Sequence, residues 1–584
     1  MVNRNSAYQQ DIPRQPDVAG QCRTGNGWPL LISLLALGLI SVLAFVLGKP
    51  PGPLPVDAPL DQFSALRADG VLEHLVSDGI PHPAGSDQNR IVRNKIAALL
   101  KSFGYEVHLQ ETEAHINRTR SEVDPETVPL CNIMARLKGA SDEPAIMLVT
   151  HFDSVPYGPG ASDDGVGVAS MLEVARMLKK MDPPQRSVIF LFTDGEEYGL
   201  LGAKKFVEHH AWANDVGWVI NLEARGTKGP SILFETGSES VSLIREFANV
   251  SRRPIASSLF FEIYKHLPND TDFTVFKNHG MQGYNFAFIG NVKNYHTPDD
   301  NFATVNRASF QHHGENMWRL VSRLAYLEKM PRPQGQAVYF DVFGRLLVWW
   351  PASWSVWMTL CGGLVWAGSG WICFKRGDVS ANSLLIAAGC FLLVCVVLLL
   401  MGWLCDFGLR RDGRLDNPWP QYPLPMILSF WLLGLVTAAA LSLGLGRVGT
   451  PSSHWLIVWF TWLVAALLTS IYLPGASYLF IAPALVAVVS QFVLRNVLKI
   501  SLGGVSGLSI VAVGVIWIPM EPLFYDAVGF RLNQILILRV TVVMTVIWPL
   551  LVWTRSGIVW WTLVTSSLLL IGFLLTGFFM NAVI

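Results

Sequence analysis

The chain has 584 residues, of which 51% are hydrophobic and only 15% are charged, against roughly 25% charged residues in a typical soluble domain. Lysine plus arginine and aspartate plus glutamate both number 44, which excludes a strongly basic chain, so we expect no nucleic-acid partner. This length also exceeds one ordinary domain.

The first fifty residues predict a membrane anchor. Residues 1–28 form a polar tail with scattered arginines, and residues 29–48 form an apolar run long enough to cross a bilayer. Lys49-Pro50-Pro51 follows the run in place of the small residues of a signal-peptide cleavage site. We therefore interpret residues 29–48 as a transmembrane anchor with the tail in the cytoplasm.

Residues 51–335 have the composition of a soluble domain. Hydrophobic spacing predicts helices at 60–78, 87–104, 166–180 and 200–210, and strands within 105–138 and at 145–150, 187–193 and 217–221. Strands that alternate with helices predict an α/β fold, in which a mostly parallel sheet is sandwiched by helices.

The remainder, residues 346–584, is almost continuously apolar and predicts an all-α transmembrane domain of about eight helices. The expected spans are 352–374, 382–404, 424–446, 455–473, 476–494, 503–520, 532–553 and 558–580. Together with the anchor they make nine.

Loop charges predict the orientation. Basic residues fall mainly in loops on the side of the N-terminus: Lys375, Arg376, Arg447, Arg495, Lys499 and Arg555. The loop with Arg410, Arg411 and Arg414 departs from this pattern. Because basic loops stay in the cytosol, the soluble domain is expected on the other side of the membrane.

Acids and histidines follow the predicted strands of the soluble domain. They are His151, Asp153, Asp163, Asp164, Glu196, Glu197, Glu223 and His296. Each motif alone has a structural explanation, such as a turn at Asp163-Asp164-Gly165 or a solvated helix start at Glu196-Glu197. Together, at the strand ends where α/β enzymes place their active groups, they predict a metal site with nitrogen and oxygen ligands that suit zinc.

These motifs resemble one known family. His151-x-Asp153, Gly160-Ala-Ser-Asp163-Asp164-Gly165, Gly195-Glu196-Glu197 and Tyr295-His296-Thr297-x-x-Asp300 resemble the zinc peptidases of family M28. The multi-span C-terminal part resembles the membrane branch of that family, the endoplasmic reticulum metallopeptidase and vacuolar membrane protease group.

The resemblance implies two Zn²⁺ ions per chain. It implies that His151 and Glu223 bind the first ion, that Glu197 and His296 bind the second, and that Asp163 bridges both. Many members of the family have aspartate where this chain has Glu223. Glu196 takes the position of the general base and Asp153 that of a residue holding the His151 ring, and a cis peptide is implied between Asp163 and Asp164.

The residues themselves support this chemistry. Three carboxylates and two neutral imidazoles leave two zinc ions with residual positive charge, which lowers the pKa of a bridging water toward about 7. Glu196 is not a ligand, so its carboxylate is available to take a proton from the water and pass it to the leaving amine.

We therefore expect a di-zinc exopeptidase, specifically an aminopeptidase, that is anchored in a lipid bilayer and acts on peptide substrates. Its catalytic domain would face the periplasm of a bacterial inner membrane or the lumen of a vacuole or endoplasmic reticulum. The sequence leaves open whether the chain binds a membrane protein partner or forms a homo-oligomer.

Several alternatives are open at this point. His151-Phe-Asp153-Ser-Val-Pro156 also fits the M20 peptidase group, but Glu197 and His296 leave little room between them for an inserted lid domain. A third possible enzyme class is a glutaminyl cyclase, which would bind a single zinc ion on the same scaffold. A non-catalytic receptor would normally have lost ligands, and a transporter would place paired charges or broken helices within the spans.

Three further expectations concern residues outside the ligand set. The segment Asn269–Phe273 is expected to border the active site. His209, His210, His312 and His313 lie in helical stretches and are expected on the surface. Arg539, near the outer end of a span, is expected to extend toward the membrane interface.

Overall fold

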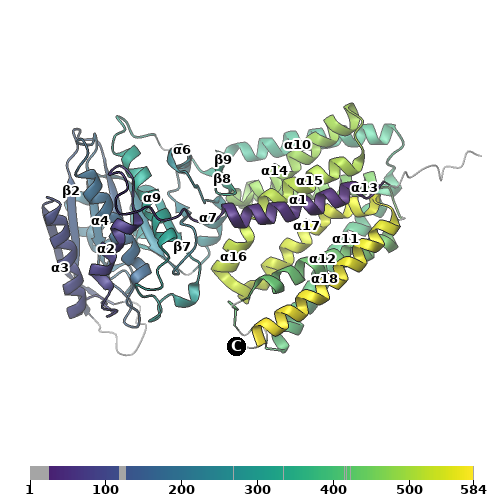
Figure 1. The fold of residues 1–584 in the computed structure, drawn as a ribbon. Coiled ribbons are helices and arrows are strands. Elements are labelled where there is room, and N and C mark those ends of the chain that lie inside the picture. Colours follow the sequence, from purple (N-terminus) through teal and green to yellow (C-terminus); the bar gives the residue numbers. More distant parts are fainter. Residues whose placement is uncertain are drawn as a thin grey trace, which may run out of the picture.

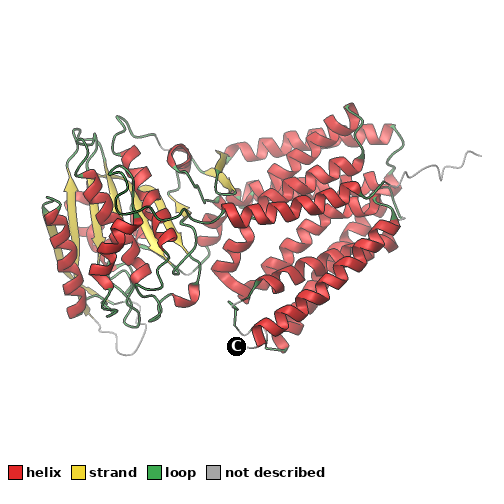
Figure 2. Ribbon diagram, in the orientation of Figure 1, coloured by secondary structure: helices red, strands yellow, loops and turns green. Residues whose placement is uncertain are grey.

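The computed structural model describes residues 25–582 except 117–126, 268, 333, 414, 416, 421 and 447. Most of the predicted cytoplasmic tail therefore lies outside the described residues, as do Arg414 and Arg447. The chain forms an α/β domain and a long helical part side by side (Figure 1). Figure 2 shows strands only in the first part and at the junction between the two.

A seven-stranded sheet forms the centre of the α/β domain, in the order β1-β2-β4-β3-β5-β7-β6. The strands are β1 Val107–His115, β2 Thr127–Leu137, β3 Ala145–His151, β4 Val188–Thr193, β5 Val216–Ala224, β6 Ile232–Thr236 and β7 Gln282–Phe288. The four central strands are parallel, while β1, β2 and β6 pair antiparallel at the two edges. The α/β prediction is confirmed, and the sheet is mixed because β2 and β6 run opposite to the other five strands.

Helices cover both faces of the sheet, because its central strands are apolar on both sides. On β3, Ile146 and Leu148 pack toward one face with α2 Ala65–Val76, α3 Asp87–Ser102, α4 Gly167–Leu178, α6 Ser240–Val250 and α9 Arg307–Leu324. The alternate residues Met147 and Val149 pack toward the other face with α5 Leu201–His209 and α8 Asp272–Asn278. The predicted sandwich is therefore present.

The helical part contains α1 and α10 to α18. Their bounds are α1 Trp28–Leu47, α10 Ser353–Lys375, α11 Ala381–Arg411, α12 Leu424–Leu445, α13 Pro451–Tyr472, α14 Tyr478–Ser490, α15 Leu502–Trp517, α16 Met520–Val528, α17 Asn533–Trp553 and α18 Ser556–Ala582. Within the described residues, eight helical stretches are long and apolar enough to cross a membrane. One of them, Leu502–Trp553, comprises α15, α16 and α17, where the sequence predicts two separate spans.

Arg539 on α17 differs from its expected position. Its side chain is 4% exposed, forms an ion pair with Glu521 at 2.9 Å and donates a hydrogen bond to the carbonyl of Trp517 at 2.5 Å. Because α16 brings an acid and α15 a carbonyl to this guanidinium, it is paired inside the protein rather than extended to the membrane interface.

The α/β domain joins the helical part through the short helix α7 Ser258–Tyr264 and the hairpin of β8 Ala337–Val342 and β9 Leu346–Pro351. Gly475, in the turn between α13 and α14, donates its N–H to Glu262 at 3.1 Å and accepts a hydrogen bond from Ser258 at 2.7 Å. A Cβ at Gly475 would lie 2.6 Å from the Ser258 carbonyl oxygen. The absence of a side chain thus permits the close approach of the two parts.

Candidate metal centre

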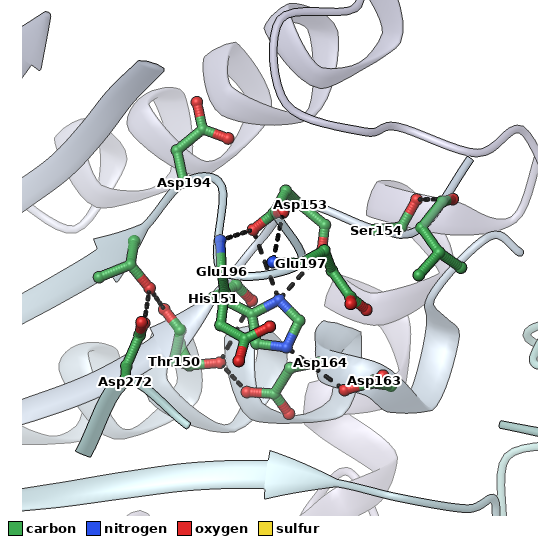
Figure 3. A network of polar contacts seen from close by, with 12 residues as sticks. Thr150, His151, Asp153, Ser154, Asp163, Asp164, Asp194, Glu196, Glu197 and Asp272 are labelled. Atoms are coloured by element: carbon green, nitrogen blue, oxygen red, sulfur yellow. Dashed lines mark hydrogen bonds and ion pairs between the residues drawn. The ribbon is translucent and has the colours of Figure 1, made fainter. Parts of the chain in front are cut away.

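The predicted ligands converge at the carboxyl ends of the parallel strands. His151 ends β3, and Glu223 lies near the end of β5. Asp163 lies in the turn before α4, Glu197 in the loop after β4 and His296 in the loop after β7. Adjacent parallel strands end at the same edge of a sheet, which brings together residues far apart in the sequence. Figure 3 shows how His151 and Asp163 point toward one another.

His151, Asp163 and Glu223 form one buried group whose candidate ligand atoms all lie within 4.8 Å of one another. His151 Nε2 is 3.3 Å from Asp163 Oδ1 and 3.7 Å from Glu223 Oε2.

Asp163, Glu197 and His296 form a second group of the same kind. His296 Nε2 is 3.2 Å from Asp163 Oδ2 and 3.0 Å from Glu197 Oε1. Asp163 thus directs one carboxylate oxygen to each group, which is the arrangement required of a ligand shared by two ions.

The chemistry of these donors fits zinc. Each group contains one imidazole and two carboxylates, which are common zinc ligands, and three ligands are one fewer than tetrahedral zinc takes. Burial would raise the pKa of Asp163, but the imidazoles of His151 and His296 outweigh it and hold the pKa below its ordinary value. Burial lowers the pKa of His296, but the Asp163 and Glu197 carboxylates outweigh burial and raise that pKa to about 9. The site is therefore strongly attractive to cations.

Glu196 lies beside both groups without belonging to either. Desolvation raises the pKa of its carboxyl well above the usual range; His151 partly opposes this shift, and the Glu223 and Glu197 carboxylates add to it. A non-ligand carboxyl in this position is suited to carrying a proton.

Asp153 holds the turn that carries the two glutamates. Its Oδ1 accepts the N–H of Glu196 at 3.0 Å and its Oδ2 accepts the N–H of Glu197 at 3.2 Å. His151 Nδ1 lies 3.0 Å from the Asp153 carbonyl oxygen and 3.6 Å from its carboxylate. The backbone of Asp153 therefore contacts the imidazole more closely than the predicted carboxylate does, and leaves Nε2 facing the other ligands.

Asp300 is a further buried group, which ends the Tyr295-His296-Thr297-x-x-Asp300 motif and whose role the sequence alone does not reveal. Its carboxylate accepts the backbone N–H groups of Ser162 at 2.8 Å and Asp163 at 3.1 Å. It thereby fixes the turn that presents Asp163 to both groups.

The sequence motifs also did not indicate a polar network that lies behind Glu223. Asn221 Nδ2 donates to Glu223 Oε1 at 3.2 Å and to Asn285 Oδ1 at 3.0 Å. Asn285 Nδ2 donates in turn to Glu235 Oε2 at 2.9 Å, and Glu235 pairs with Lys277. These residues lie on β5, β7, β6 and α8, so no local motif could have indicated the network.

The segment Asn269–Phe273 also reaches the site. Asp272 begins α8, is buried and accepts a hydrogen bond from Thr193 at the end of β4. Its charge raises the pKa of the Glu196 carboxyl. A contact between this segment and substrate stays a prediction.

Comparisons with known proteins match the part of the chain that carries these residues. Residues 132–321 match the model of the protein family described as peptidase family M28. Endoplasmic reticulum metallopeptidase 1 of Mus musculus is 31% identical over 344 residues, covering 55% of this chain and 37% of that protein. Vacuolar membrane protease of Eremothecium gossypii is 34% identical over 224 residues, covering 38% of this chain and 22% of that protein.

The chain thus matches well under half the length of these relatives. Among solved structures, the aminopeptidase from Aneurinibacillus sp. strain AM-1 is 15% identical with a TM-score of 0.38, covering 47% of this chain and 98% of that chain.

Proposed function

We propose that this chain is a membrane-bound di-zinc aminopeptidase, because residues 132–321 match the model of peptidase family M28. The observation that carries the proposal is the position of Asp163 between two imidazole–carboxylate groups. His151, Asp163 and Glu223 would hold one ion, and Asp163, Glu197 and His296 the other. Zinc bound there would polarise a peptide carbonyl and lower the pKa of a water molecule.

The residues of the chain would then carry the proton. The Glu196 carboxylate takes a proton from the attacking water as the water oxygen bonds to the carbonyl carbon. It returns the proton to the amine nitrogen as the C–N bond breaks. Two backbone hydrogen bonds from this turn to the Asp153 carboxylate hold Glu196 in place during both transfers.

We further propose that the α/β domain faces away from the cytosol. The support is the excess of basic residues in the loops on the side of the N-terminus. The names of the relatives point to the endoplasmic reticulum and vacuolar membranes, and a bacterial inner membrane fits the same topology. Labelling of cysteines introduced at Lys101 and Lys375 with an impermeant reagent, in intact cells and in lysed cells, would test the orientation.

The full-length Glu196→Gln variant tests the proposed reaction. The amide is nearly the same size as the carboxyl but cannot take up the proton. We expect the variant to bind as much zinc as wild type and to lose hydrolysis of aminoacyl-anilides and peptides by a factor of at least about 10². Hydrolysis at the wild-type rate would refute the role of Glu196.

The same measurements separate the alternatives. One zinc per active wild-type chain would favour a glutaminyl cyclase-like enzyme. Two zinc ions without hydrolysis of any peptide would favour a binding protein on a peptidase fold.

A further inference from the structure

A cavity of about 490 Å³ lies at the junction between the α/β domain and the helical part. Its walls come from the last turn of α1, the end of α15, the first turns of α16 and several loops of the α/β domain. The volume lies within the ~300–1,000 Å³ of typical ligand pockets. The cavity contains none of the residues of the candidate metal centre.

The cavity lies beside the end of α1 that meets the α/β domain, where a bilayer crossed by this helix would give way to lipid headgroups. The helix α1 is long and apolar enough to cross a membrane and ends at Leu47, one residue before Gly48-Lys49-Pro50. Phe45, on the last turn of α1, lines the cavity and is 63% exposed. The cavity therefore reaches the outer face of α1, and in a bilayer the neighbour of that face is lipid.

The lining of the cavity is amphipathic. The helices contribute the apolar side chains of Phe45, Ile516, Met520 and Leu523. Lys49 follows α1, and Lys228 lies in the loop after β5; both side chains are exposed and belong to the lining. Two ammonium groups beside an apolar wall complement a phosphate group attached to acyl chains.

Two acids also belong to the lining and limit which ligand fits. Asp341 accepts the backbone N–H groups of Ala256 at 3.3 Å and Gly344 at 2.7 Å, so both of its oxygens are engaged within the protein. Asp526 on α16 also faces the cavity. It suits a hydrogen-bond donor on the ligand, such as the hydroxyl or ammonium group of a phospholipid headgroup.

We propose that this junction cavity binds the headgroup of a membrane glycerophospholipid, with the phosphate on Lys228 and Lys49 and the acyl chains along Phe45 and Met520. The inference rests on the helices spanning a bilayer and is independent of the proposed peptidase reaction. It assigns the junction the role of a specific lipid site, beyond that of a contact between two domains.

Native mass spectrometry of the full-length protein in detergent tests the proposal, with phosphatidylglycerol as the probe. We expect wild type to retain one phosphatidylglycerol molecule tightly and to bind diacylglycerol with the same acyl chains at least about tenfold more weakly, because the phosphate supplies charge-assisted bonds. Lys228→Gln should weaken phosphatidylglycerol binding by a similar factor. The matched control is Lys101→Gln on α3, at the far end of the α/β domain (Figure 1), which should bind like wild type.

A second variant fills the cavity without changing its charge. Ala308, at the start of α9, belongs to the lining, so Ala308→Trp should also displace the lipid while both lysines remain. Equal retention of diacylglycerol and phosphatidylglycerol by wild type, or wild-type binding by both Lys228→Gln and Ala308→Trp, would overturn the proposal.

Discussion

Replacement of Asn285 by leucine tests whether the network behind Glu223 positions a zinc ligand. Asn285 is fully buried and nearly the same size as leucine. Its amide donates to Glu235 at 2.9 Å and to Thr271 at 2.8 Å, and accepts from Asn221 at 3.0 Å. The bond to the carboxylate contributes about 1.5–3 kcal/mol and each neutral bond about 1 kcal/mol, so Asn285→Leu should lower the free energy of unfolding by roughly 3–5 kcal/mol.

The effect on metal binding should be selective. Without Asn285, Asn221 loses the group that orients it toward Glu223. Loss of such supporting hydrogen bonds typically weakens metal binding by about 10–100-fold. The site containing Glu223 should weaken by this factor, while the site formed by Glu197 and His296 should change little.

Zinc titration of the full-length protein against a competing chelator gives both dissociation constants, and thermal unfolding in detergent gives the stability. Asn249→Leu, at an exposed position near the end of α6, is the control for the loss of an amide. If Asn285→Leu binds both ions like wild type, or weakens both equally, the network stabilises the fold and does not position Glu223.

Three other predictions follow from buried contacts. Asp300→Asn replaces one of the two carboxylate oxygens of Asp300 by an amide donor that faces a backbone N–H. Because Asp163 serves both sites, the zinc content should fall at both. Unchanged zinc content would contradict the role of Asp300. Burial lowers the pKa of His312 to about 4 and of His313 to about 3 from the ordinary 6.5, so the unfolded chain binds more protons at low pH. The contribution of these two histidines to stability should therefore be constant above about pH 6.5 and fall below it, by roughly 1.4 kcal/mol per pH unit for each histidine. His312→Gln should reduce that slope in thermal unfolding between pH 7.5 and 4.5. Gly475→Val places a branched side chain against the Ser258 carbonyl, so limited proteolysis should release the α/β domain faster from this variant than from wild type. The control is Gly557→Val, because a side chain at that position meets no other atoms. Equal rates of release from the two variants would contradict the importance of the Gly475 contact.

The sequence was sufficient to predict the parts of the fold that follow from local pattern. The short apolar runs that became β3, β4 and β5 were found because both faces of these strands are buried. The convergence of His151, Glu223 and His296 followed from the rule that parallel strands end at one edge. The resemblance to family M28 is confirmed by the family match over residues 132–321.

The sequence was insufficient where a residue's environment is set by distant segments. His312 and His313 were expected on the surface, and that prediction is wrong: both are buried, and both ring Nδ1 atoms face Ser231. Their helix packs against the loop after β5 as well as the core, which its own periodicity does not reveal. Asp300 and Asn285 were unassigned for the same reason, since their partners lie on other elements.

The zinc content of the wild-type protein and of Asp163→Ala tests the central claim most directly. Asp163 is the one residue common to both ligand groups, so its loss should affect both ions. We expect two zinc ions per folded wild-type chain by elemental analysis, and fewer than one in a variant that remains folded. Two ions retained by Asp163→Ala, or no zinc in folded wild type, would contradict a paired zinc centre at these residues.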